Sequence, residues 1–130
     1  MNNKTINNWL KLAEYDLKTA KAMFDTKRYL YVAFTCQQSI EKVLKALFIK
    51  ENNQTPPYTH NLQRLLESIS IISEVDDDFP DFINELNIYY IESRYNEELE
   101  DIAKLLNKSK AKWILTKSEE IFKWLKAKIK

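Results

Sequence analysis

A chain of 130 residues is one domain by length, and the complete absence of glycine makes a sheet fold a poor candidate for it. Glycine supplies the positive φ angles of tight turns and phosphate-binding loops, so its absence excludes the P-loop and the dinucleotide-binding fingerprint. The lone Cys36 excludes an intrachain disulfide and a cysteine-based zinc site, and the lone His60 excludes a metal site built on paired histidines. No apolar run approaches the ~20 residues that span a bilayer, and the start lacks a signal peptide's hydrophobic region. We therefore expect residues 1–130 to form a single cytoplasmic domain with no metal or other cofactor.

The formal net charge of +1 conceals an uneven distribution along the chain. Residues 1–66 carry ten basic and five acidic side chains, and residues 67–101 carry twelve acidic side chains and one basic. Residues 104–130 carry nine lysines and two glutamates. Two explanations stay open: acidic and basic helices pair within the fold, or a basic face meets phosphates.

Apolar residues three and four positions apart recur along nearly the whole chain, which predicts helices. Pro56 and Pro57 separate two of them, and Thr59 and Asp78 are good N-cap residues. The expected helices run from about Asn7 to Asp25, from Tyr29 to about Asn52, from Thr59 or His60 to Ile72, from Asp78 to Arg94, from Asn96 to Leu106 and, after a weak break at residues 107–109, to the end. Because short links favour antiparallel neighbours, the pattern predicts an all-α, antiparallel up-and-down bundle of four long helices plus a short one.

Three of the expected helices have apolar faces that should be buried. On the first helix this face is Trp9, Ala13, Leu17, Ala20 and Phe24, flanked by Leu12 and Met23. On the third it is Leu62, Leu65, Leu66, Ile69 and Ile72, and on the last it is Ala111, Ile114, Leu115, Ser118, Ile121, Phe122, Leu125 and Ile129.

The helix expected from Tyr29 onward is apolar over most of its circumference, which is typical of a helix in the middle of a bundle. Its centre nevertheless carries a polar strip, defined here as Gln37, Gln38, Glu41, Lys42 and Lys45. Buried amides and charges are costly without partners. The strip therefore either reaches solvent, with Glu41 and Lys45 as an ordinary i,i+4 pair on an exposed edge, or it faces a ligand, a partner protein or a second subunit.

Two further residues could carry function. His60 either orients the turn in which it lies, or contacts a phosphate, or shuttles a proton near neutral pH. Arg94 is the only basic residue in an acidic block and is followed by Tyr95. An arginine beside aromatic rings can hold a phosphate while a ring stacks on a base, but it can equally bond a carboxylate and hold two helices together. The acidic run at 76–78 lacks the spacing of a Ca²⁺ loop, so we expect it to be a solvated capping loop.

Four stretches, in order, make the chain resemble the HEPN domain family (higher eukaryotes and prokaryotes nucleotide-binding). They are the opening Trp9-Leu10 with Ala13, Asp16-Leu17 and Ala20, the core Gln37-Gln38-Ser39-Ile40-Glu41-Lys42-Val43-Leu44-Lys45-Ala46, the turn Thr59-His60-Asn61-Leu62, and the signature Ser93-Arg94-Tyr95. The resemblance implies an all-α bundle that forms homodimers and binds nucleotides or RNA. It also implies a partner, because members are commonly encoded beside a small nucleotidyltransferase in toxin–antitoxin-like pairs.

Many members of that family are metal-independent ribonucleases that use an arginine followed at a short interval by a histidine. Leu99, Glu100 and Asp101 occupy the corresponding interval after Arg94, so this motif is absent and its catalytic residues are not transferred. Asn96 also replaces the expected proline of the signature.

The expected function is therefore a nucleotide- or RNA-binding module without catalytic residues. Its expected site has Lys42, Lys45 and Arg94 at phosphate, Tyr95 stacked on a base and His60 as a hydrogen-bonding group, with Gln37, Gln38 and Glu41 completing the polar strip. The alternatives are a divergent ribonuclease and a purely structural dimerisation or adaptor module.

Overall fold

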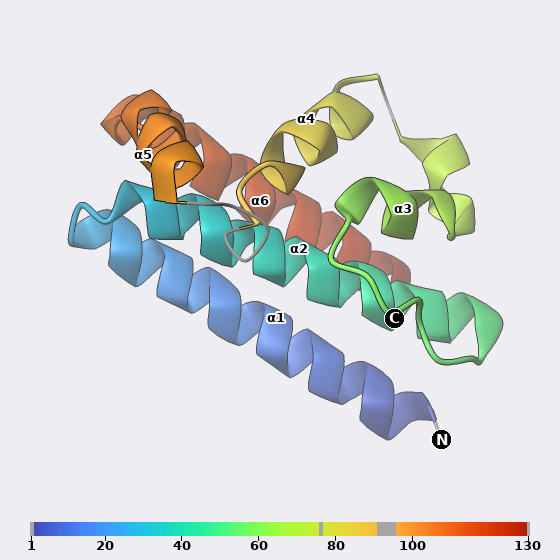
Figure 1. Cartoon of the computed structure of the whole chain (residues 1–130). Coiled ribbons are helices and arrows are strands. Elements are labelled where there is room, and N and C mark those ends of the chain that lie inside the picture. Colours follow the sequence, from blue (N-terminus) through green and yellow to red (C-terminus); the bar gives the residue numbers. More distant parts are fainter. Residues whose placement is uncertain (1, 76, 91–95, 130) are drawn as a thin grey trace.

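The computed structural model describes residues 2–75, 77–90 and 96–129, and the side chains of these residues except 2, 72 and 96–99. All regular elements in these ranges are helical (Figure 1). They are α1 (Asn2–Asp25), α2 (Tyr29–Asn52), α3 (Leu62–Glu67), the 3₁₀-helix η1 (Ser70–Glu74), α4 (Asp78–Asn87), α5 (Asn96–Leu105) and α6 (Lys108–Ile129). The predicted all-α class is confirmed.

Three long helices build the frame, with α2 lying between α1 and α6 (Figure 1). The short turn at 26–28 makes α1 and α2 an antiparallel hairpin, as predicted. Near the start of α6, Lys112 Nζ lies 5.3 Å from the centre of the Phe24 ring, which is near the end of α1. Near the end of α6, Lys126 pairs with Glu14 at 2.6 Å. α6 therefore runs opposite to α1 and in the same direction as α2.

Among the described residues, two have left-handed backbone, and neither is a glycine. Lys27 has a φ of 64° in the turn between α1 and α2, and Asn53 has a φ of 53° at the end of α2. Asparagine tolerates this conformation well, whereas a lysine carries a cost of roughly 1 kcal/mol. Backbone bonds hold both turns: Arg28 N–H donates to Met23 O at 2.7 Å, and Asn53 N–H donates to Ile49 O at 2.8 Å.

The buried faces follow the helical periodicity closely. All eight residues of the face predicted for the last helix are buried in α6. α1 begins at Asn2 rather than Asn7, and the extra turn adds Ile6 to the core. Leu12, expected to flank the buried face of α1, is instead exposed.

The third expected helix is shorter than predicted and begins later. Asn61 Oδ1 accepts a hydrogen bond from Arg64 N–H at 3.2 Å, which makes Asn61 the N-cap. Thr59, the predicted cap, instead accepts from Asn61 N–H at 3.1 Å and so stabilises the turn before the helix. The backbone becomes extended at Ile69, so the predicted stripe is divided between α3 and η1.

The fourth expected helix ends at Asn87 in α4, well before Arg94, which lies outside the described residues. Its predicted cap is also wrong, because Asp77 rather than Asp78 occupies the N-cap position and makes no side-chain capping bond. The buried face of α4 consists of Phe79, Phe82, Ile83 and Leu86, which recur at helical spacing.

The segregated charges are partly explained by pairing within the fold. Lys110, Lys126 and Lys128 of α6 pair with carboxylates of other elements, namely Glu85, Glu14 and Glu74. All three pairs are partly exposed, so each is worth little in stability. None of the described helices has the length and apolarity needed to cross a membrane.

Candidate functional site

A buried ion pair lies in the middle of α2. Lys45 Nζ is 3.1 Å from Glu41 Oε2, and the two side chains are only 8% and 4% exposed. The i,i+4 pair was predicted, but its placement on an exposed edge is wrong. Trp9 covers the lysine, whose Nζ lies 5.4 Å from the ring centre, and His60 covers the glutamate. A buried charge without a partner is strongly destabilising. The ion pair therefore compensates the burial of both Glu41 and Lys45.

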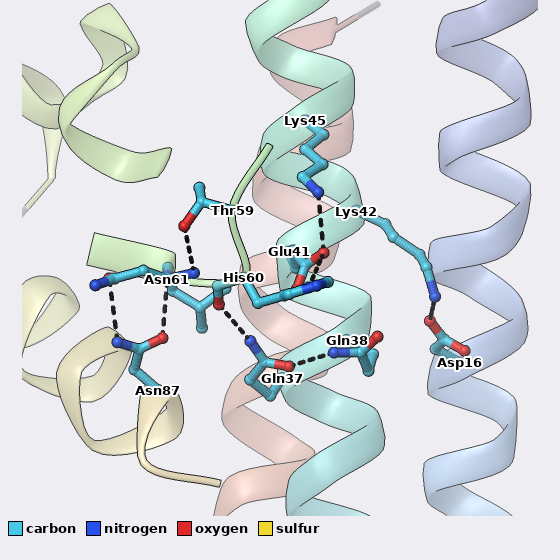
Figure 2. A network of polar contacts seen from close by, with 11 residues as sticks. Asp16, Gln37, Gln38, Glu41, Lys42, Lys45, Thr59, His60, Asn61 and Asn87 are labelled. Atoms are coloured by element: carbon cyan, nitrogen blue, oxygen red, sulfur yellow. Dashed lines mark hydrogen bonds and ion pairs between the residues drawn. The ribbon is translucent and has the colours of Figure 1, made fainter. Parts of the chain in front are cut away.

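His60 is oriented by the same carboxylate. Its Nδ1 lies 3.0 Å from Oε1 and 3.1 Å from Oε2 of Glu41 (Figure 2). A carboxylate only accepts hydrogen bonds, so Nδ1 must carry the proton. Nε2 has no hydrogen-bond partner within the described residues, and the side chain is 40% exposed. The imidazole therefore offers Nε2 as an acceptor when neutral and as a donor when charged.

Amide side chains hold the loop that carries His60. Gln37 Nε2 donates to the backbone oxygen of His60 at 2.9 Å, and Gln38 Nε2 donates to Gln37 Oε1 at 2.6 Å (Figure 2). Gln37 is fully buried, and a buried amide that is hydrogen-bonded on both sides has few other positions available.

The residue after His60 is fixed from α4. Asn87 Nδ2 donates to Asn61 Oδ1 at 3.1 Å, and Asn87 Oδ1 accepts from Leu62 N–H at 2.8 Å (Figure 2). A residue 25 positions away thus completes the cap of α3. Gln37 and Asn87 thus hold the chain from the carbonyl group of His60 to the amide of Leu62.

Every member of the polar strip has a partner within its own chain. Lys42, the remaining member, forms an ion pair with Asp16 of α1, and both side chains are about one-fifth exposed. The polarity of the strip therefore does not by itself require a ligand or a second subunit. Contact of Lys42 and Lys45 with phosphate stays a prediction, as do the roles of Arg94 and Tyr95, which lie outside the described residues.

Aromatic rings surround the imidazole. Tyr90 stacks on His60 with ring centroids 4.4 Å apart and planes inclined by 17°. Tyr58 stands 6.3 Å from His60 at 61° and is 98% exposed. The stacked Tyr90 ring restrains one face of the imidazole. The Tyr58 ring is exposed to solvent.

A pocket of about 500 Å³ lies next to this cluster, between the start of α1, the end of α2 and the loop that follows. Its lining is mostly apolar and includes Trp9, Ile49, Pro57 and Tyr58, with Lys45 as its one charged side chain. Volumes of this size and linings with few polar groups are typical of small-molecule sites. Lys45 connects the pocket to the Glu41–His60 pair.

Neither the lone cysteine nor a metal site offers an alternative centre for chemistry in the part of the chain that the structure describes. Burial raises the pKa of the Cys36 thiol to about 12, so the thiol stays protonated and unreactive at neutral pH. Across residues 2–75, 77–90 and 96–129, no cluster of three or more histidine, cysteine or acidic side chains is arranged to hold a metal ion. The oriented imidazole and the adjoining pocket therefore form the candidate site.

Four residues of this cluster were not predicted as site residues from the sequence. The helical periodicity indicates only a core role for Trp9 and Tyr90, and it assigns no role to Asn87. Tyr58 did carry a signal, because it follows the rigid Pro56-Pro57 pair two residues before the only histidine. The contacts of Asn87 could not be predicted, since they depend on how α4 packs on α3.

Comparisons with known proteins agree on the fold. The chain is similar to TT1696 from Thermus thermophilus, with 23% identity, a TM-score of 0.82 and coverage of 98% of this chain and 99% of that one. It is also similar to ST0689, described as an archaeal HEPN homologue, with 22% identity, a TM-score of 0.76 and coverage of 96% and 98%. No curated protein matches it significantly. The model of the HEPN domain matches residues 6–128, and the chain therefore belongs to the HEPN domain family.

Proposed function

We propose that this protein is a cytoplasmic, homodimeric module that binds nucleotides or RNA and partners a nucleotidyltransferase in a toxin–antitoxin-like pair. One observation carries the binding role. Lys45 lines the apolar pocket and also pairs with Glu41, the carboxylate that orients the His60 imidazole. The dimer, the nucleotidyltransferase and the pairing are supported by membership of the HEPN family.

In this proposal the base enters the pocket against Trp9 and Tyr58, and the sugar-phosphate group lies toward His60. Stacking of bases on aromatic side chains is favourable whatever the base, and Nε2 can donate to a phosphate oxygen when the imidazole is charged. Lys45 is already paired with Glu41, so it contributes a positive field at the pocket wall rather than a free ammonium group. Arg94 and Tyr95 follow Tyr90 by four and five positions, and Arg94 is proposed to bind the phosphate and Tyr95 to stack on a base.

Calorimetry with adenosine and uridine monophosphates tests this assignment. Trp9→Leu, His60→Asn and Arg94→Ala should each weaken binding about tenfold while leaving the far-UV circular dichroism spectrum unchanged. Tyr15→Ala is the matched control, because Tyr15 is an exposed ring elsewhere on α1 and should bind as the wild type does. No binding by the wild type at millimolar nucleotide would reject the proposal.

A metal-independent ribonuclease is the second candidate, favoured by the Glu41–His60 contact. A carboxylate that fixes the Nδ1–H tautomer leaves Nε2 as a base, and such a base could remove the proton from a ribose 2′-hydroxyl. Labelled RNA incubated with the protein in excess chelator separates the two functions. Cleavage that disappears in His60→Ala would establish the enzyme, whereas intact RNA bound by the protein would support the binding module.

The internal satisfaction of the polar strip favours a third candidate, a structural dimerisation or adaptor module. Its distinguishing property is indifference to nucleotides. A bound nucleotide must raise the melting temperature by mass action, so a melting curve that no nucleotide shifts would favour this candidate. Sedimentation measures the dimer directly, and co-purification with the product of a neighbouring nucleotidyltransferase gene tests the proposed partner.

A further inference from the structure

Five rings form a continuous row across the surface from the start of α2 to the loop before α3. Successive ring centroids are separated by 6.4 Å from Tyr31 to Phe34, 6.3 Å from Phe34 to Tyr90, 4.4 Å from Tyr90 to His60 and 6.3 Å from His60 to Tyr58. We call these five residues the aromatic row. The His60–Tyr58 end adjoins the pocket described above, and Tyr31 lies at the opposite end.

Burial in the core does not account for this row. Tyr58 is almost fully exposed and Tyr31 is 48% exposed, while Phe34, Tyr90 and His60 are all partly accessible. Exposed aromatic rings placed singly need no explanation. A chain of five in mutual contact, drawn from α2, the segment after α4 and the loop before α3, is a contiguous π surface of the kind on which nucleic-acid bases stack.

The charge around the Tyr31 end suits a phosphate backbone. Lys27 and Arg28 are both exposed and stand within one turn of Tyr31. From residue 29 to residue 40 the chain carries no carboxylate. Glu41, the first acidic residue after that stretch, is buried and bonded to Lys45 and His60. Along residues 27–40, a strand on the row thus meets Lys27 and Arg28 at one end and uncharged side chains beside Tyr31 and Phe34.

We propose that the aromatic row binds single-stranded nucleic acid, with one base in the pocket and further bases stacked on the row as far as Tyr31. This rests on the proposed nucleotide-binding function and extends it from a mononucleotide to a strand. One nucleotide at the pocket cannot also reach Tyr31, because Phe34, Tyr90 and His60 lie between the two ends. Lys27 and Arg28 neutralise phosphates of the distal nucleotides, which makes strand binding more sensitive to salt than mononucleotide binding.

Fluorescence anisotropy with labelled uridylate and thymidylate oligomers of increasing length, alongside uridine monophosphate, tests the row. Affinity should rise with length until the strand reaches Tyr31. Tyr31→Ala should weaken the longer oligomers about tenfold and leave the monophosphate unchanged. Tyr31→Phe keeps the ring and should bind as the wild type does, and Tyr15→Ala is the control for a distant exposed tyrosine. Both uridylate and thymidylate oligomers should bind, because every base has a π-face that can stack on the rings.

Different results would reject the aromatic row and the nucleotide-binding function. Monophosphate binding without any gain from length, together with a neutral Tyr31→Ala, would overturn the aromatic row and leave the pocket intact. Absence of binding for monophosphate and oligomers alike would overturn both. A Tyr31→Ala variant that dissociates a dimer in sedimentation while binding oligomers normally would make the row a contact between two copies of the chain, which also overturns the proposal.

Discussion

Glu41 accepts a hydrogen bond from His60 Nδ1 at 3.0 Å, across 19 positions of sequence, while it is buried against α2's own Lys45. The carboxylate thus serves two cationic or donating partners at once. The pairing of Glu41 with Lys45 compensates the cost of burying charge. The contact of Glu41 with the imidazole also fixes the position of the only histidine. The stability of the domain and the geometry of the candidate site therefore depend on the same side chain.

We expect Glu41→Gln to lower the free energy of unfolding by about 3 kcal/mol, because Lys45 would remain buried without a counterion. Urea denaturation measures this loss. Lys45→Met in the same chain should restore most of it, since it removes the buried ammonium group that lacks a counterion. Asp25→Asn is the matched control, because its pair with Lys21 is more than half exposed and should change stability by less than about 0.5 kcal/mol. A Glu41→Gln variant as stable as the control would contradict the interpretation.

The buried faces were predictable from the sequence, whereas the site geometry mostly was not. The face of α6 was predicted completely, since the period of 3.6 residues fixes which side chains share a helix face. The Glu41–Lys45 pair could also be predicted, because its members lie four positions apart on one helix. The contact of Glu41 with His60, that of Lys42 with Asp16 and the capping of α3 by Asn87 all join residues at least 19 positions apart. Such contacts depend on loop paths and helix packing, which no local pattern specifies.

The tautomer of His60 gives a direct test of its orientation. We expect ¹⁵N NMR of the neutral imidazole to show the proton on Nδ1, because the Glu41 carboxylate can only accept. Glu41→Gln should weaken this preference, since an amide can either donate or accept. The protein has one histidine, so the resonance needs no assignment by mutation. A wild-type spectrum dominated by the Nε2–H form would show that the contact with Glu41 is not maintained in solution.

Removal of the Asn87 side chain should loosen the loop that carries His60. Asn87→Ala deletes the hydrogen bonds to Leu62 N–H and Asn61 Oδ1, and we expect a loss of about 1 kcal/mol in the free energy of unfolding. Asn84→Ala is the control, because Asn84 is exposed on the same helix and alanine has the better helix propensity. Hydrogen exchange at the amide of Leu62 should accelerate in Asn87→Ala only. Equal exchange at Leu62 in both variants would show that Asn87 does not hold the loop that carries His60.

The Cys36 thiol should make the stability of the domain fall at alkaline pH. Burial raises its pKa from 9.0 to about 12 in the folded chain, so the unfolded chain releases this proton first as the pH rises. The folded state then binds more protons than the unfolded state, and the free energy of unfolding decreases with pH. The contribution of Cys36 is complete below about pH 8 and is lost progressively as the pH rises toward 12.

Urea denaturation of the wild type and of Cys36→Ala across this range isolates the contribution, because lysines and tyrosines titrate in both proteins. The stability of the wild type relative to the variant should fall steadily above about pH 9. At neutral pH the thiol should react with Ellman's reagent only as fast as the chain unfolds, since the side chain is fully buried. Rapid labelling of the native protein, or a stability difference that stays constant with pH, would contradict the burial of Cys36 of α2 against Ser118 of α6.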